Sequence, residues 1–148
     1  MRYPLDARSV KKPFEIIDHT ADIGIIAYGV DIKQFFSNAA LGLFSLITEV
    51  EDIKENLKQD IKISSQDREG LLVEWLNELL YLFDVEHMVF KRFEFDELSD
   101  SKLEARCFGD RINPREQKIK REVKAATYHM LAISKENNGY KAQIIFDI

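Results

Sequence analysis

Two stretches of this sequence repeat apolar residues with the period of an α-helix, and they limit the fold more than any other feature. The first follows Asp31, which forms a capping-box pattern with Gln34, and it ends near Thr48. The second begins at Asp67. We expect two amphipathic helices, each with one buried face, because burying each such side chain contributes about 1.5–3 kcal/mol. The apolar positions are Ile32, Phe35, Phe36, Ala39, Ala40, Leu43, Phe44 and Ile47, then Leu71, Leu72, Trp75, Leu76, Leu79, Leu80 and Phe83.

Short segments that alternate apolar and polar residues surround the helices and are typical of strands with one wet face. The dipeptide Asn138-Gly139 is a strong hairpin signal, because both turn positions favour positive φ. The order of elements predicts a single-domain α+β fold, with two amphipathic helices packed on one face of a mainly antiparallel β-sheet. The expected strands cover residues 14–19, 23–28, 60–64, 88–95, 102–108, 123–134 and 140–147.

Length and composition bound the class of protein. The 148 residues suit one domain, which we expect at residues 13–148 behind a flexible N-terminal extension at residues 1–12. The single cysteine, Cys107, cannot form an internal disulfide, and no secretory leader is recognisable. No apolar run approaches the roughly 20 residues that a membrane span needs. We therefore expect a cytoplasmic protein that does not enter membranes.

The charge balance argues against tight RNA binding. Lysine and arginine total 21 against 26 aspartates and glutamates, for a formal net charge of −5. A protein that binds nucleic acid needs cations to displace counterions from phosphate, so we expect tRNA to be bound only weakly or indirectly. A basic run at residues 111–124 could form a local patch, although a solvated strand face or loop is the commoner interpretation. Its cations are Arg111, Arg115, Lys118, Lys120, Arg121 and Lys124.

Motifs for nucleotide binding or covalent catalysis do not occur, so no catalytic residue is assigned. Polar residues collect instead in the short segment DHTAD at residues 18–22, between two expected strands. Another carboxylate lies at Asp147, followed by the α-carboxylate of Ile148. Oxygen ligands of this kind suit Ca²⁺, Mg²⁺ or Mn²⁺.

Each residue of the DHTAD segment also has a structural interpretation. Asp18 and Asp22 are typical of aspartates that cap a bend with their own side chains. His19 is more often a structural histidine bonded to a backbone carbonyl or a neighbouring aspartate than a metal ligand. Spacing by itself does not decide between these interpretations and a metal site.

The expected hairpin gives Asp147 a register. With Asn138 and Gly139 as the turn, counting outward puts Met130 opposite Asp147, which faces away from the core. Lys124 then lies about 20 Å along the strand from Asp147, at about 3.3 Å per residue. That separation is too long for one metal site. Either Lys124 acts elsewhere, as an exposed strand lysine would, or a bulge changes the register.

Three segments, FEIIDHTADIGIIAYG, EVKAATYH and IIFDI, resemble the archease family. The likeness extends through the two helical stretches and so covers nearly everything from Phe14 onward. It implies a compact α+β protein that binds a divalent metal, commonly Ca²⁺, with Mg²⁺ and Mn²⁺ as alternatives. The implied ligands are Asp22, Asp147 and Ile148, with Asp18 and His19 as candidates for a supporting role.

The resemblance also implies a function. Archeases are not themselves enzymes; they activate an RtcB-type RNA ligase, which joins tRNA halves through a guanylylated histidine, by promoting guanylylation and multiple turnover. The lysine of the EVKA segment, here Lys124, is implied in that activation. The family often has a histidine in the preceding loop, where this sequence has Gln117.

Two other functions are compatible with the residues. One is a stand-alone metal-dependent hydrolase, in which a bound ion activates water, although the sequence offers no obvious general base beyond His19. The other is a chaperone or a modulator of an RNA-modifying enzyme.

Overall fold

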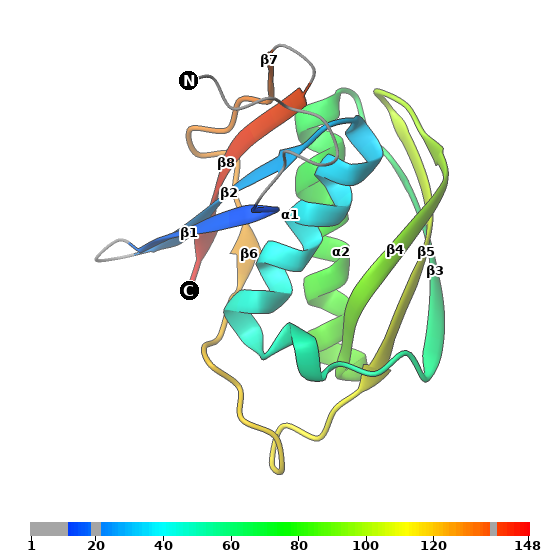
Figure 1. The fold of residues 1–148 in the computed structure, drawn as a ribbon, viewed down its shortest axis with the longest axis vertical. Coiled ribbons are helices and arrows are strands. Elements are labelled where there is room, and N and C mark those ends of the chain that lie inside the picture. Colours follow the sequence, from blue (N-terminus) through cyan, green and yellow to red (C-terminus); the bar gives the residue numbers. More distant parts are fainter. Residues whose placement is uncertain (1–11, 19–21, 137–138) are drawn as a thin grey trace.

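The computed structural model describes residues 12–18, 22–136 and 139–148, and within them helices and strands alternate in short runs (Figure 1). The expected extension lies outside this part of the chain, except for Lys12. In chain order the elements are β1 (Phe14–Asp18), β2 (Ile23–Gly29), α1 (Ile32–Ile47), the 3-10 turn η1 (Val50–Asp52), β3 (Leu57–Ser64), α2 (Arg68–Glu86), β4 (Met88–Leu98), β5 (Lys102–Arg111), β6 (Ala125–Ala126), β7 (Ser134–Glu136) and β8 (Gly139–Asp147).

The strands form two antiparallel sheets. In the first sheet the order is β1-β2-β8-β6, and β7 also pairs with β8; in the second the order is β3-β5-β4. Figure 1 shows the two helices between these sheets. The α+β class with two helices against antiparallel strands is confirmed. The strands divide between two sheets, however, so the helices cover one face of each.

Helix α1 is apolar on two sides because it contacts both sheets. Phe35 and Phe36 are neighbours in sequence, but they pack against different layers. The ring of Phe35 lies 6.2 Å from that of Tyr140 on β8, and the ring of Phe36 lies 6.5 Å from that of Phe95 on β4. A helix buried on two sides needs apolar residues beyond a single stripe. Trp75 of α2 joins the two helices, because its Nε1 donates to the carbonyl oxygen of Phe36 at 3.1 Å.

Both helices begin at the aspartates expected from the sequence. The Asp31 carboxylate accepts from the backbone N–H of Gln34, and that of Asp67 accepts from Gly70, each at 2.7 Å. Gln34 completes the first cap, because its Oε1 accepts from the N–H of Val30 at 2.7 Å. These bonds satisfy donors that a helix start leaves without partners.

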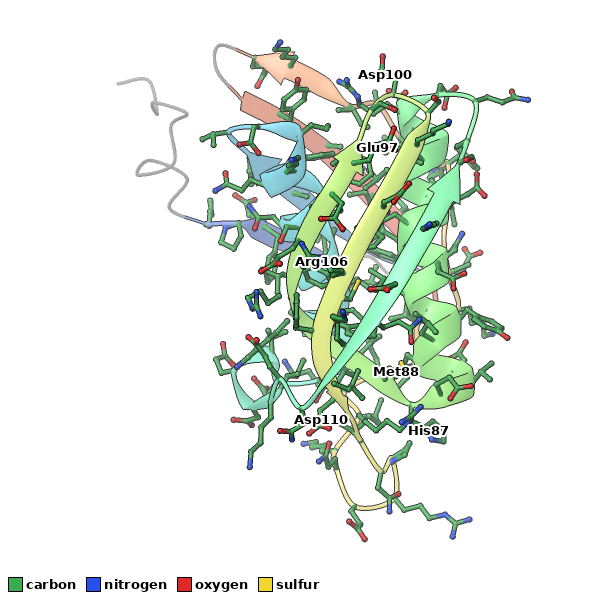
Figure 2. All side chains as sticks on the ribbon, turned by 90° about the vertical axis from the view of Figure 1, so that its right-hand side faces the viewer. His87, Met88, Glu97, Asp100, Arg106 and Asp110 are labelled. Atoms are coloured by element: carbon green, nitrogen blue, oxygen red, sulfur yellow. The ribbon has the colours of Figure 1, made fainter. Side chains whose placement is uncertain are left out.

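The outer face of the second sheet carries a ladder of charged side chains. Figure 2 shows Arg106 on β5 in the middle of this face. Arg106 pairs with Asp96 at 2.9 Å and with Glu94 at 3.3 Å, and Arg92 also pairs with Glu94. Exposed ion pairs contribute about 0–1 kcal/mol each to the stability of a fold, so the main effect of this ladder is to keep the outer face of the sheet polar and hydrated.

The predicted hairpin register is wrong. Glu136 pairs with Gly139 and Ser134 with Lys141, so Gly139 belongs to β8 and not to a turn. Asn138 lies outside the described residues. The predicted strand over residues 123–134 is also wrong as one continuous element, because only β6 and β7 belong to the ladder.

The residues between β6 and β7 leave the ladder as a bulge. Ala126 lies opposite Phe146, and Ser134 lies opposite Lys141. Between these two pairs the segment from β6 to β7 advances by eight residues, whereas β8 advances by only five. Met130 within the bulge has φ of 56°, a left-handed conformation that no strand accommodates. The alternation of apolar and polar residues here resembled a strand, but it does not show where a strand stops pairing.

Among the described residues, no helix is both long and apolar enough to cross a membrane.

Candidate metal centre

Strands β2 and β8 bring two distant aspartates together. Ile23 pairs with Phe146, and continuing this register by one residue places Asp22 opposite Asp147. Both Ile23 and Phe146 are buried against the helices. Because side chains alternate along a strand, the next pair points to the other face of the sheet. Asp147 is accordingly exposed and Asp22 half-buried.

Strand β6 brings Lys124 to the same place from the other side of β8. Ala125 pairs with Asp147, and the backbone N–H of Lys124 donates to the carbonyl oxygen of Asp147 at 2.8 Å. The predicted separation of about 20 Å between Lys124 and Asp147 is therefore wrong. Of the two alternatives left by the sequence, the changed register is the one observed. The shifted pairing of β7 with β8 and the bulge after β6 together cause it.

The two aspartates meet the basic requirement of a cation site. Within the described residues, neither the Asp22 nor the Asp147 side chain has a hydrogen-bond or ion-pair partner, so their oxygens are available. Ile148 follows Asp147 at the exposed end of β8. Hard oxygen donors of this kind fit Ca²⁺ or Mg²⁺. No three His, Cys, Asp or Glu side chains form a metal-binding group in the part of the chain that the structure describes.

The candidates for a supporting role are only partly described. Asp18 ends β1, where it pairs with Ile23 and is exposed. This position puts it beside the strand that begins after Asp22. His19 lies outside the described residues.

Asn77 contacts the same region, although no sequence pattern indicated this. Its Oδ1 accepts from the backbone N–H of Ala126 at 2.8 Å, and its Nδ2 donates to the Ala126 carbonyl oxygen at 3.4 Å. The amide thus pairs with the backbone of β6 from the side opposite β8. In the sequence, Asn77 is an amide residue that follows Leu76 in a leucine-rich helix. This position by itself does not indicate which group the amide contacts.

Part of the basic run has a structural role. Lys120 donates its backbone N–H to Ile47 at 2.8 Å and its Nζ to the carbonyl of Ser45 at 3.2 Å, while Arg121 donates to the carbonyl of Leu46 at 3.1 Å. These carbonyls belong to the last turn of α1, where cations are favoured by the helix dipole. Lys120 and Arg121 therefore cap a helix.

Gln117, singled out in the sequence by the archease resemblance, lines a different region. It borders a polar cleft of about 450 Å³ together with Asp52, Asn56, Asp110 and Lys118. Asn56 donates to the Asp110 carboxylate within this cleft at 3.0 Å.

The pKa values of an aspartate and of the cysteine outside the centre are raised. Partial burial raises the pKa of Asp84 on α2, and the nearby Glu122 carboxylate raises it further. Burial also raises the pKa of the Cys107 thiol far above its ordinary value, with a smaller contribution from Asp60. Cys107 is thus a protonated core residue rather than a nucleophile.

The model of the Archease protein family (MTH1598/TM1083) matches residues 14–148. The chain belongs to the archease family. It is 38% identical over 141 residues to the archease of Methanosarcina mazei, and the matched region covers 93% of this chain and 97% of the relative. It is 39% identical over 141 residues to the archease of Pyrococcus furiosus, with 93% and 99% covered.

Solved structures of archease relatives have the same fold. The solution structure of Methanobacterium thermoautotrophicum protein 1598 matches with a TM-score of 0.75 at 36% identity, covering 92% of this chain and 99% of that one. The crystal structure of a Thermotoga maritima archease, described as a possible chaperone, matches with a TM-score of 0.61. At 19% identity over 89% of this chain and 94% of that one, this second likeness concerns the fold alone.

Proposed function

We propose that this chain is a divalent-metal-binding protein that activates an RtcB-type RNA ligase by promoting its guanylylation and multiple turnover in tRNA splicing or repair. It performs no catalysis of its own in this scheme. The ligase and the chain act together in the cytoplasm, and tRNA contacts this chain only weakly.

One observation carries the proposal: strand β8 lies between the segment that begins with Asp22 and the segment that holds Lys124. Ile23 pairs with Phe146 on one side, and Ala125 pairs with Asp147 on the other. Three stretches that resemble the archease motifs therefore meet at one strand end. A cation site and a lysine at the same exposed edge form a compact surface that a partner protein can contact.

The residues have separate roles in this proposal. Asp22, Asp147 and the carboxylate of Ile148 would hold Ca²⁺, Mg²⁺ or Mn²⁺, which supplies positive charge where a phosphate is attacked. Lys124 supplies a second positive charge from β6. A tenfold faster step needs a barrier only about 1.4 kcal/mol lower, which one charge contact across an interface can provide.

The test is the guanylylation rate of a purified RtcB-type ligase, measured with GTP and Mn²⁺ or Mg²⁺, with and without this chain at substoichiometric amounts. We expect a faster first guanylylation and repeated rounds of ligation. A ligase whose rate and turnover are the same with and without the chain would disprove the activator role.

A second candidate, a chaperone role, is favoured by the description of the Thermotoga maritima relative and by the exposed side chains of Tyr128 and Met130. The same preparation separates it from the first. Suppression of aggregation of an unrelated unfolded protein, without ligase activation, would favour the chaperone role. Hydrolysis of RNA by the chain alone would instead favour the metal-dependent hydrolase.

A further inference from the structure

We infer that Asn77 of α2 is a positioning residue for Lys124, because its side chain fixes β6 against β8 so that Lys124 lies beside Asp147. The consequence for ligase activation rests on the proposed function. The placement of Lys124 does not, and it can be measured on the isolated chain.

Strand β6 is too short to hold its own position. It has only two residues, and both pair with β8 alone. The outer edge of β6 would leave the N–H and C=O of buried Ala126 without a strand partner. Asn77 fills this role: its amide is both acceptor and donor for Ala126, as a neighbouring strand residue would be.

Along the chain, hydrogen bonds to β8 come before and after Ala126, the residue that Asn77 contacts. Before it, the N–H of Lys124 donates to Asp147 at 2.8 Å. After it, the N–H and hydroxyl of Thr127 both donate to the carbonyl of Ile145, at 3.0 and 2.8 Å. Beyond Thr127 the chain leaves the ladder. Asn77 therefore holds the middle of the segment at residues 124–127, whose backbone otherwise bonds only to β8 among the described residues.

A second α2 side chain provides a matched control. Glu69 accepts from the N–H of Ile133 at 3.2 Å, at the far end of the bulge. This contact has the same type, from a helix side chain to a backbone amide between β6 and β7, but it lies away from Lys124. Asn77 and Glu69 thus differ in which end of the segment they hold.

The first measurement is amide hydrogen exchange of the isolated full chain. Asn77→Leu keeps the size of the side chain but removes both bonds. We expect the amides of Ala126 and Lys124 to exchange about tenfold faster, while those of β4 and β5 stay as in the wild type. Glu69→Ala should accelerate Ile133 and leave Lys124 unchanged. Wild-type exchange of Lys124 in Asn77→Leu would overturn the inference.

Asn77→Asp covers the case in which Asn77→Leu does not fold by circular dichroism. The carboxylate still accepts from the Ala126 N–H, but it cannot donate to the Ala126 carbonyl and repels it. Lys124 exchange should rise severalfold in this variant. Exchange at the wild-type rate would overturn the inference as well.

The second measurement is ligase guanylylation as a function of the concentration of each folded variant. A displaced Lys124 lowers the maximal stimulation, and we expect a loss of about tenfold for Asn77→Leu and none for Glu69→Ala. If the wild-type chain stimulates the ligase and Asn77→Leu reaches the same maximal stimulation, the role of Asn77 in activation would be overturned. A wild-type chain that gives no stimulation would refute the proposed function, and the exchange data would then decide the placement alone.

Discussion

Asp22 and Asp147 stand near opposite ends of the sequence and are neighbours only because β2 and β8 share a ladder. Neither residue looks unusual by itself, since an aspartate at a strand end is ordinary. Their pairing next to Ile148 is what makes them candidates for one cation site. Oxygen ligands from separate segments bind a cation well only when the fold brings them together.

Removing one of these proposed ligands should weaken cation binding without unfolding the chain. We expect Asp22→Ala and Asp147→Ala each to lower Ca²⁺ affinity by tenfold or more, or about 1.4 kcal/mol, in calorimetric titration. Both side chains point away from the core, so thermal stability without the metal should stay close to that of the wild type. Asp52→Ala, an exposed aspartate of η1, is the control. Unchanged affinity in both variants would rule out this ligand set.

Lys124→Ala should separate activation from metal binding. The backbone bond from Lys124 to Asp147 survives the substitution, because only the side chain is shortened. Removing a positive charge beside a cation site leaves Ca²⁺ affinity equal or somewhat higher, since like charges repel. Ligase stimulation should fall at least about tenfold, or 1.4 kcal/mol. Loss of Ca²⁺ binding in this variant would show that Lys124 supports the ligands directly.

At the scale of elements, the segment from β5 to β6 does most to organise the centre. It caps α1 through Lys120 and Arg121, runs beside α2 at Glu122, and then joins β8 as β6. Two cations of the basic run, Lys120 and Arg121, therefore attach this irregular segment to the end of α1 by hydrogen bonds. A run of charge in a loop can have such a local role, which is visible only once the helix end is placed.

The raised pKa of Asp84, caused mainly by partial burial and further by the Glu122 carboxylate, should make the stability of the chain depend on pH. The pKa of Asp84 is raised above its ordinary value of 3.8, so its ionised form is disfavoured in the fold. The cost is absent below that ordinary pKa and is fully present above the raised one. Asp84→Asn should stabilise the chain at pH 7, by at most about 0.5 kcal/mol at this exposed position, and the gain should vanish near about pH 3. Thermal melts of both proteins across this range test the sign; an equal gain at both pH values would contradict it.

Glycine is required where β4 and β5 approach closely. A Cβ on Gly109 would overlap the carbonyl oxygen of Val89 and the backbone of Phe90, next to the register shift after Phe90. Gly109→Ala should therefore destabilise the chain by about 1–3 kcal/mol. Gly42→Ala in α1 is the comparison, because its Cβ would lie 2.7 Å from the terminal methyl of buried Ile25, a side-chain end that can shift, and not against backbone. The cost of that shift offsets a gain of up to about 1 kcal/mol in helix propensity, so this variant should lose less stability than Gly109→Ala. Urea denaturation measures both; an undisturbed Gly109→Ala would show that the bulge adapts.

At the scale of the whole molecule, the sequence predicted local structure well and pairing less well. Asp31 and Asp67 begin the helices as expected, because a capping bond depends on residues three positions apart. The two layers of strands and the position of Lys124 depend on contacts between distant segments. The positive φ of Met130, which breaks the expected strand, has no signal in the alternation of its neighbours. The family resemblance identified Lys124 and Asp147, but only the register brought them together.

The two sheets should form at different times during refolding. Strands β4 and β5 follow each other directly in the chain, whereas the first sheet pairs Ile23 with Phe146. Distant pairings form more slowly, since a long loop must close first. In pulsed hydrogen exchange after dilution from denaturant, we expect amides of β4 and β5 to be protected before those of β2 and β8. Simultaneous protection of both sheets would show that the molecule folds as one unit.

The central position of β8 also matters while the chain is being synthesised. β8 is made after every other described strand, yet it lies between β2 and β6. At about 5–20 residues per second, β2 waits on the order of ten seconds for this neighbour. Until then β2 presents an unpaired edge, which can recruit other chains. A truncated chain that ends before Gly139 contains the segments of both helices and of the second sheet, but it lacks Asp147. The candidate centre can therefore form only after β8 has been synthesised.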